Sequence, residues 1–258
     1  MINPVINPLM QGDFLTEMPL KTAIQEFLFR LEKDGSIFWV GVALPLGTTD
    51  FTRVQVFFHP TVVQAGTVHA ADADYPAFGG GWSRSIQRYV AMEGGQLAGA
   101  RLLPLLVPFT TMGALNDPAK NMFSIEPLET LNAVLTAVQA EVSPFPLGDV
   151  ELSKIGVSSF SSGIGATRKF IETMKPTGTV QEVTDFDSPF IIAEPKHLTL
   201  SPGAVSRCYT QVALPHPPVG WIHLAPNSFS HLSSFKSDPH ACIGWMLYFA
   251  GMLSSVIV

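Results

Sequence analysis

The sequence has few charged residues: only 14% of its 258 residues are Asp, Glu, Lys or Arg, against about 25% in typical soluble proteins. Its 15 Lys and Arg residues are scattered, and the formal net charge is −6. Nucleic-acid binding needs clustered basic side chains that neutralise phosphates, so the sequence indicates no nucleic-acid partner. The hydrophobic fraction of 47% predicts a large core, or exposed apolar surface suited to an apolar ligand.

Cysteine is also scarce, since only Cys208 and Cys242 are present. They form no CxxC or Cys/His spacing, which fits a reducing compartment and gives no zinc signature. The first residues lack the basic and apolar regions of a secretory signal, so we expect a cytoplasmic protein. The uncharged run 241–258 has no flanking basic cluster, so we expect a helix packed in the core and no integral membrane segment.

Apolar periodicity predicts strands that alternate with helices along the whole chain. This pattern favours a single α/β domain over residues 1–258, with a mostly parallel central sheet and helices on both faces. The strands at 36–47 and 52–60 are joined by a short turn, so we expect them to be neighbours in the sheet. Further strands are predicted at 100–109, 150–159, 179–187 and 219–225, and helices at 20–35, 83–95, 124–142, 163–174 and 201–211.

Four serines lie at the break between the strand at 150–159 and the following helix. A strand-to-helix turn tight enough to expose a side chain needs small residues two places before and two places after it. Of the serines between Val157 and Gly163, Ser161 meets this condition, while the other three have Phe160 or Val157 at one of the two places. Ser161 is therefore the candidate nucleophile.

The segment 159–163, Ser-Phe-Ser-Ser-Gly, resembles the G-x-S-x-G nucleophile elbow of the α/β-hydrolase family, with serine replacing the first glycine. The resemblance implies an α/β-hydrolase-like fold and a serine hydrolase that requires no cofactor. It also implies an oxyanion hole formed by the backbone N–H of Ser162 and a second N–H at Thr61. The family often has His-Gly near the second position, where this chain has His59-Pro60, and proline has no N–H to donate.

The family supplies its acid and its histidine after the serine, in that order. Asp185 and Asp187 end the next strand and are expected to point the same way, and Asp187 is preferred because it lies at the strand's carboxyl end. His240 is preferred as the base because it starts the last predicted helix, and His231 is the alternative. The resemblance thus implies a triad of Ser161, Asp187 and His240.

The polar, glycine-containing segment 62–81 lies between predicted elements. His69, Asp72 and Asp74 within it have the form of part of a metal site, but no second cluster supplies further ligands, so we expect no metal. We expect the segment to act as a lid whose apolar residues face an acyl chain.

These features predict a carboxylesterase or lipase-like serine hydrolase acting on a small-molecule ester with an apolar acyl group. The alternative is a non-catalytic protein of the same fold that binds an apolar ligand or a protein partner. The sequence does not predict the oligomeric state.

Overall fold

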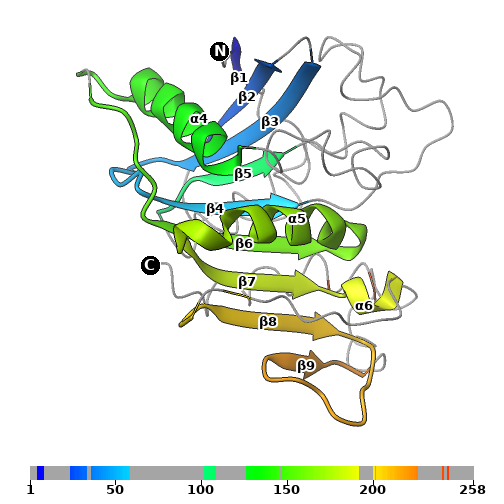
Figure 1. Ribbon diagram of the computed structural model, residues 1–258. Helices are drawn as coiled ribbons and strands as arrows, with labels where there is room; N and C mark the ends of the chain where they lie inside the picture. Colours follow the sequence, from blue (N-terminus) through cyan, green and yellow to red (C-terminus); the bar gives the residue numbers. More distant parts are fainter. Residues whose placement is uncertain are drawn as a thin grey trace, which may run out of the picture.

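The computed structural model describes residues 5–8, 24–33, 36–58, 102–108, 126–145, 147–191, 200, 202–225, 240 and 243. Within these ranges, nine strands form one sheet in the order β1-β2-β3-β5-β4-β6-β7-β8-β9 (Figure 1). The strands are β1 (Val5–Pro8), β2 (Ile24–Lys33), β3 (Ser36–Pro45), β4 (Arg53–Phe58), β5 (Leu105–Pro108), β6 (Lys154–Phe160), β7 (Val180–Phe186), β8 (Val205–Thr210) and β9 (Trp221–His223).

The strand directions divide the sheet into two parts. The pairs β1–β2, β2–β3 and β3–β5 are antiparallel. From β5 through β4, β6, β7 and β8 to β9, every neighbouring pair is parallel. The predicted mostly parallel sheet is therefore confirmed. Because neighbouring parallel strands end at the same edge, the turns after β6 and β7 lie side by side.

The first periodic apolar segment forms a strand, so the predicted helix over 20–35 is wrong. β2 pairs with β3 along its whole length. Among its described side chains, Phe27, Phe29 and Leu31 are buried, at a spacing of two residues. The apolar residues of this segment fit a period of two as well as a helical period, and pairing with two neighbouring strands decides between them. The dipeptide Asp34-Gly35 between β2 and β3 is typical of hairpins, and this signal outweighs the helical spacing.

Two predictions about the central and late strands are also wrong. β3 and β4 are not neighbours, because β5 lies between them and pairs with both. The segment 201–211 contains β8 rather than a helix, and it pairs with β7 on one side and β9 on the other. Hydrogen bonds to two flanking strands outweigh the local pattern there.

The helices α4 (Pro127–Val142) and α5 (Ile164–Met174) lie where the sequence predicts them. They cover the same face of the sheet and contact each other (Figure 1). A short helix, α6 (Ser188–Ile191), follows the carboxyl end of β7. The predicted helix over 83–95 lies outside the described residues, as does most of the C-terminal run, of which Ile243 is helical.

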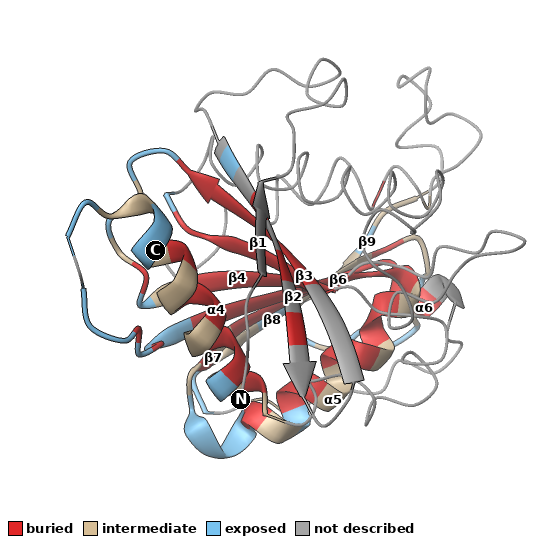
Figure 2. Cartoon of the chain, turned by 90° about the horizontal axis from the view of Figure 1, so that it is seen from above, coloured by how far each residue is buried: buried red, intermediate tan, exposed pale blue. Residues whose placement is uncertain are grey.

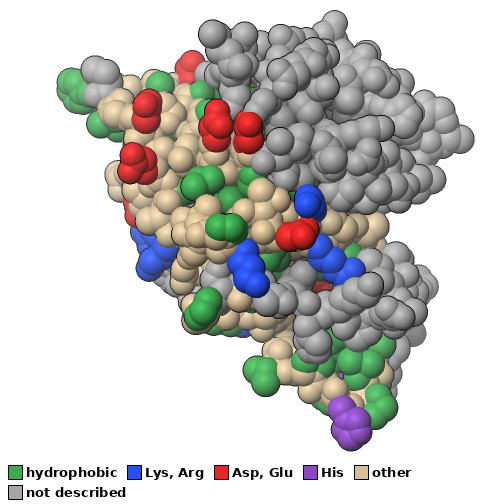
Figure 3. Space-filling model, viewed as in Figure 1, with side chains coloured by type: hydrophobic (Ala, Val, Ile, Leu, Met, Phe, Trp, Pro, Cys, Tyr) green, Lys and Arg blue, Asp and Glu red, His purple; other side chains and the backbone are tan. Residues whose placement is uncertain are grey.

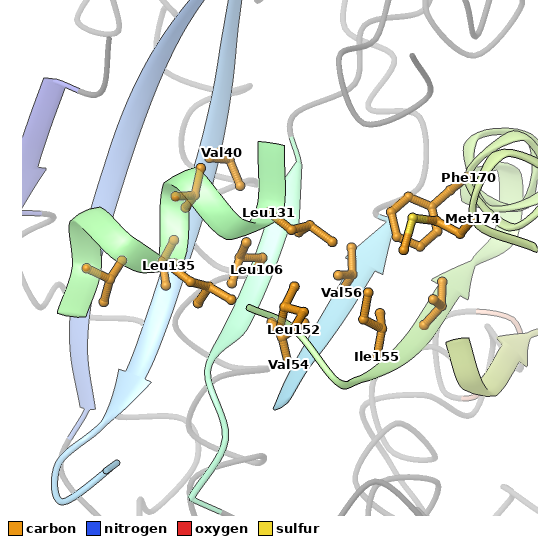
Figure 4. Packing of buried hydrophobic residues seen from close by; sticks show 14 of the residues in the cluster. Val40, Val54, Val56, Leu106, Leu131, Leu135, Leu152, Ile155, Phe170 and Met174 are labelled. Carbon is orange, nitrogen blue, oxygen red and sulfur yellow. The ribbon is translucent and has the colours of Figure 1, made fainter. Parts of the chain in front are cut away.

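The core lies between these two helices and the sheet. Leu131 and Leu135 of α4, and Phe170 and Met174 of α5, point toward strand side chains such as Val56 (Figure 4). The central strands are buried along almost their whole length beneath the helices (Figure 2). Burying one such side chain stabilises the fold by about 1.5–3 kcal/mol, so this core fixes the frame on which the strand ends are held.

The face that carries the helices is seen directly in Figure 3. Acidic side chains there lie mostly over α4 and basic ones mostly over α5. On α5, Lys169 and Glu172 form an exposed ion pair of 3.3 Å, which contributes little to stability because water screens it. Among the described helices, none is long and apolar enough to cross a membrane.

Candidate active site

The turn after β6 has a strained backbone at Ser161. Phe160 is extended, with φ −121° and ψ 133°, and Ser161 then has a φ of +55°. The short 3-10 helix η5 (Ser161–Gly163) leads directly into α5. A positive φ is uncommon for residues other than glycine, and such strain persists only where the surrounding structure enforces it. Ser159 and Gly163, the small residues on either side, are both buried, as a tight turn requires.

A second positive φ, +56°, occurs at Asp187, directly after β7. Its backbone N–H donates to the carbonyl oxygen of Tyr209 on β8, at 2.7 Å. The turn therefore carries Asp187 away from the regular alternation of β7. Although the sequence predicts that Asp185 and Asp187 point the same way, their side chains have different hydrogen-bond partners among the described residues. α6 begins at the next residue and contacts η5, which brings the turns after β6 and β7 together (Figure 1).

The side chain of Asp187 is fully buried and accepts four hydrogen bonds. Nδ1 of His240 lies 2.7 Å from Oδ2. Oδ1 accepts from Thr210 Oγ1 at 2.6 Å and from the backbone N–H of Gln211 at 3.0 Å. Gln211 Nε2 donates to Oδ2 at 2.7 Å. These bonds fix the orientation of the carboxylate and, through it, that of the imidazole.

Sequence patterns do not identify Thr210 and Gln211 as part of this site. Both lie at the end of β8, a segment that the sequence predicts as a helix. A correct prediction of β8 would place its carboxyl end beside that of β7, and polar residues there would then be candidates for the site.

His240 also contacts the turn that carries the serine. Its ring centroid lies 4.7 Å from that of Phe160, the residue before Ser161, with an angle of 36° between the ring planes. Its side chain is 19% exposed, so the ring lies at the border between the core and solvent. The structure therefore joins His240 to Asp187 on one side and to the residue preceding Ser161 on the other.

Asp185 is the second buried carboxylate of the site, and its partners differ from those of Asp187. Ser159 Oγ donates to its Oδ1 at 3.2 Å. Ser188 Oγ and Cys208 Sγ, the latter at 3.4 Å, donate to its Oδ2. Burial raises the pKa of Asp185 to about 6, although the three hydrogen bonds act in the opposite direction. Cys208 is a free thiol, and burial raises its pKa.

Several predicted site residues lie outside the described residues. They are Thr61, His59, His231, the segment 62–81 and its possible metal ligands His69, Asp72 and Asp74. Ser162 is described and is the second residue of η5. Among the described residues, no group of three or more His, Cys, Asp or Glu side chains is arranged to hold a metal ion.

A groove lined by α4 and residues 149–151 lies before the amino end of β6, at the edge of the sheet opposite Ser161. Its lining includes the carboxylates of Glu129, Asp149 and Glu151 and several alanines. Its described lining residues include no serine, cysteine or histidine, so they offer no activated nucleophile.

No protein-family model and no curated protein matches this chain. Among solved structures, it is similar to the rice cell wall degrading esterase LipA from Xanthomonas oryzae, with 12% identity and a TM-score of 0.45, over 71% of this chain and 49% of LipA. It is also similar to a thermostable esterase from Pseudomonas putida, with 15% identity and a TM-score of 0.36, over 65% and 46%. A cold-adapted esterase from an Arctic intertidal metagenomic library has 13% identity and a TM-score of 0.35, over 75% and 77%.

The matched region spans about half the length of the first two esterases. The chain's own topology carries the assignment of fold: a mostly parallel sheet, a strand-to-helix turn with a serine at its tip, and an aspartate and a histidine that follow in chain order. The resemblance expected from the sequence is thus confirmed at the level of the fold, and the chain has an α/β-hydrolase-like fold.

Proposed function

We propose that this chain is a serine hydrolase that cleaves carboxylic esters, as a carboxylesterase or lipase-like enzyme does. The observation that carries the proposal is the 2.7 Å contact between His240 Nδ1 and Asp187 Oδ2, beside the strained turn at Ser161. A serine hydroxyl needs a base to accept its proton, and an imidazole needs a carboxylate to orient it. Ser161 and Asp187 follow the neighbouring strands β6 and β7, and His240 contacts Asp187, which supports the proposal.

The proposed reaction proceeds through an acyl-enzyme. His240 Nε2 takes the proton of Ser161 Oγ as that oxygen attacks the ester carbonyl carbon. The backbone N–H of Ser162, and a second one at Thr61, stabilise the oxyanion. The C–O bond to the alcohol then breaks as His240 returns the proton to the leaving oxygen. Water, deprotonated by His240, attacks the acyl-enzyme and releases the acid, and Ser161 regains its proton.

Asp187 has a supporting part in this reaction. An ionised carboxylate only accepts hydrogen bonds, so the contact with His240 places the proton on Nδ1 and leaves Nε2 as the basic nitrogen. The donors on Thr210 and Gln211 hold the carboxylate in place as the imidazole becomes charged. The low charge content of the chain supports a substrate whose acyl group is apolar.

Labelling by a fluorophosphonate probe with peptide mapping tests the proposal. We expect the label on Ser161 and hydrolysis of nitrophenyl esters by the same preparation. Ser161→Ala should abolish both, because the attacking oxygen is lost. Ser162→Ala keeps its backbone N–H and should retain much of both. Equal losses in the two variants would show that the nucleophile is misassigned, and an unlabelled wild type would favour the non-catalytic binding protein.

A further inference from the structure

The inference concerns Asp185, a carboxylate that the proposed reaction does not use. Its side chain is 6% exposed, and among the described residues no Lys, Arg or His forms an ion pair with it. Its described partners are the hydroxyls of Ser159 and Ser188 and the thiol of Cys208. Burying a carboxylate without a cation costs free energy, and packing alone would be served better by an apolar residue.

Each partner of Asp185 is close in sequence to a group of the proposed site. Ser159 lies two residues before the proposed nucleophile, and Ser188 directly follows the proposed acid. Cys208 lies on β8, two residues before the threonine that donates to the acid. One carboxylate therefore connects the carboxyl ends of β6, β7 and β8, and it uses both of its oxygens to do so.

Ser159, one partner of Asp185, departs from the family's sequence pattern. It occupies the place of the first glycine in the G-x-S-x-G pattern. A glycine has no hydroxyl, so it would offer nothing to Asp185 Oδ1. The serine that replaces the glycine therefore donates to the buried carboxylate, with 3.2 Å between Ser159 Oγ and Asp185 Oδ1.

We propose that Asp185 is a positioning residue that fixes the turn carrying Ser161 relative to the turn carrying Asp187. Misplacing reacting groups by about 1 Å reduces rates strongly, so a direct link between the two turns preserves the distance over which His240 must take the serine's proton. This inference rests on the proposed function, because it concerns the same reaction.

The pH dependence of catalysis distinguishes a positioning role of Asp185 from a role in packing alone, which would not change it. Burial raises the pKa of Asp185 to about 6, and the titratable groups that act on it within the described residues are Asp187 and Cys208. Below this pH the protonated carboxyl no longer accepts from all its donors, so the connection weakens. The acid limb of kcat/KM should therefore include the protonation of Asp185.

Asp185→Asn is the main test, because the amide has the same shape but only one accepting oxygen. It cannot accept on both the Ser159 side and the Ser188 side, so one serine hydroxyl must turn to accept from the amide NH2. The connection then loses its charge-assisted hydrogen bonds and weakens. We expect kcat for a nitrophenyl ester to fall by about 10- to 100-fold with KM changed less than about two-fold, and an acid limb that lacks the protonation of Asp185. The rate of labelling at Ser161 should fall in parallel.

Ser159→Gly restores the family pattern and removes the other half of the contact. We expect a smaller loss of kcat, about 3- to 10-fold. In the Asp185→Asn background the contact with Ser159 is no longer charge-assisted, so adding Ser159→Gly should change kcat by less than about two-fold. If the two losses multiply instead, the residues act independently and the proposal is overturned.

Thr184→Val is the matched control on the same strand. Thr184 is fully buried, and its hydroxyl has no hydrogen-bond partner among the described residues. We expect kcat within about two-fold of wild type and an unchanged acid limb. A loss equal to that of Asp185→Asn would show that any change in β7 impairs the enzyme, which would overturn the positioning role.

Circular dichroism shows whether each variant folds, and Ser159→Gly decides the question if Asp185→Asn does not. An Asp185→Asn variant that folds and keeps its kcat within about two-fold overturns this inference but leaves the proposed function intact.

The proton resonance of His240 Nδ1–H can be measured without any substrate. If wild type is not labelled, the proposed function fails, while a shift of this resonance in Asp185→Asn still supports the positional link and an unchanged resonance overturns it.

Discussion

At the scale of single residues, the site depends on two strained positions. Ser161 and Asp187 have φ angles of +55° and +56°, and they follow neighbouring parallel strands. Each such conformation costs about 1–3 kcal/mol, so the surrounding contacts must compensate. At Asp187 this is visible in the four hydrogen bonds to its carboxylate and in its backbone bond to Tyr209. A regular continuation of β7 would not aim this side chain at His240.

His240→Ala tests the base. Without the imidazole nothing accepts the serine's proton, so kcat should fall by about 10³-fold or more while the fold is kept. Steady-state hydrolysis of a nitrophenyl ester and circular dichroism measure the two effects. His231→Ala is the matched variant and should keep most of the activity. The reverse result would assign the base to His231.

The buried carboxyl of Asp185 predicts a specific dependence of stability on pH. Burial raises its pKa from 3.8 to about 6, so the folded chain holds this proton more tightly than the unfolded chain does. The stability gained from this is complete below about pH 4 and is lost as the pH rises through about 6. The free energy of unfolding of wild type minus that of Asp185→Asn should therefore decrease between these values, by roughly 3 kcal/mol at most. Urea titrations across this range measure it, and a difference that increases with pH would contradict the assignment.

At the scale of elements, β8 has a larger part than its length suggests. Its backbone accepts the N–H of Asp187, and Cys208 and Thr210 bind the two buried carboxylates. β8 is held by β7 on one side and by the short β9 on the other. The turn that leads into β9 therefore contributes to the position of the site's supporting residues.

Gly220→Ala tests this turn. Gly220 has a φ of +84°, and a Cβ there would overlap the carbonyl oxygen of Ser206 on β8. We expect a loss of about 2 kcal/mol or more in the free energy of unfolding, together with reduced kcat, because β8 must shift. Gly203→Ala is the control, since Gly203 has a similar φ of +86° but open space around it, and it should cost about 1 kcal/mol. Equal losses in the two variants would show that backbone strain alone matters. Thermal or urea unfolding distinguishes these outcomes.

At the scale of the whole molecule, the hydrophobic core and the residues of the proposed site lie in different parts of the central sheet. The core under α4 and α5 is mostly apolar (Figure 4), whereas the buried polar groups of the proposed site gather at the carboxyl ends of β6, β7 and β8. The parallel direction of these strands produces this arrangement, because it collects their ends at one edge. The groove beside α4 lies at the other edge, and none of its described lining residues belongs to the proposed site.

Substrate preference tests the predicted apolar acyl pocket. Each methylene that a preformed apolar pocket buries contributes about 0.8 kcal/mol, so kcat/KM for nitrophenyl esters should rise up to about four-fold per carbon until the pocket is full. Removing residues 70–73 from the predicted lid should change this preference more than it changes the rate of labelling by a small probe. A preference for acetyl or charged acyl groups would contradict the apolar pocket. Changes of equal size in both measurements would indicate that the segment supports the oxyanion hole.

Local signals in the sequence are enough to predict two features of the fold. The small residues around Ser161 mark the tight turn, and the helical spacing in α4 is long enough to exclude a strand. Both signals lie within a few residues of the feature that they specify. Neither depends on where the remaining chain goes.

The strands β2 and β8 and the partner of His240 depend on contacts between distant parts of the chain. The apolar residues of β2 fit two periods, and its pairing with β1 and β3 selects one of them. The sequence favours Asp187 over Asp185 only by its place at the strand's carboxyl end. The contact of Asp187 with His240 depends on its positive φ and on donors at the end of β8, more than twenty residues away. Strand pairing and the closure of a buried hydrogen-bond network are long-range events, so no window of local sequence contains the information that decides them.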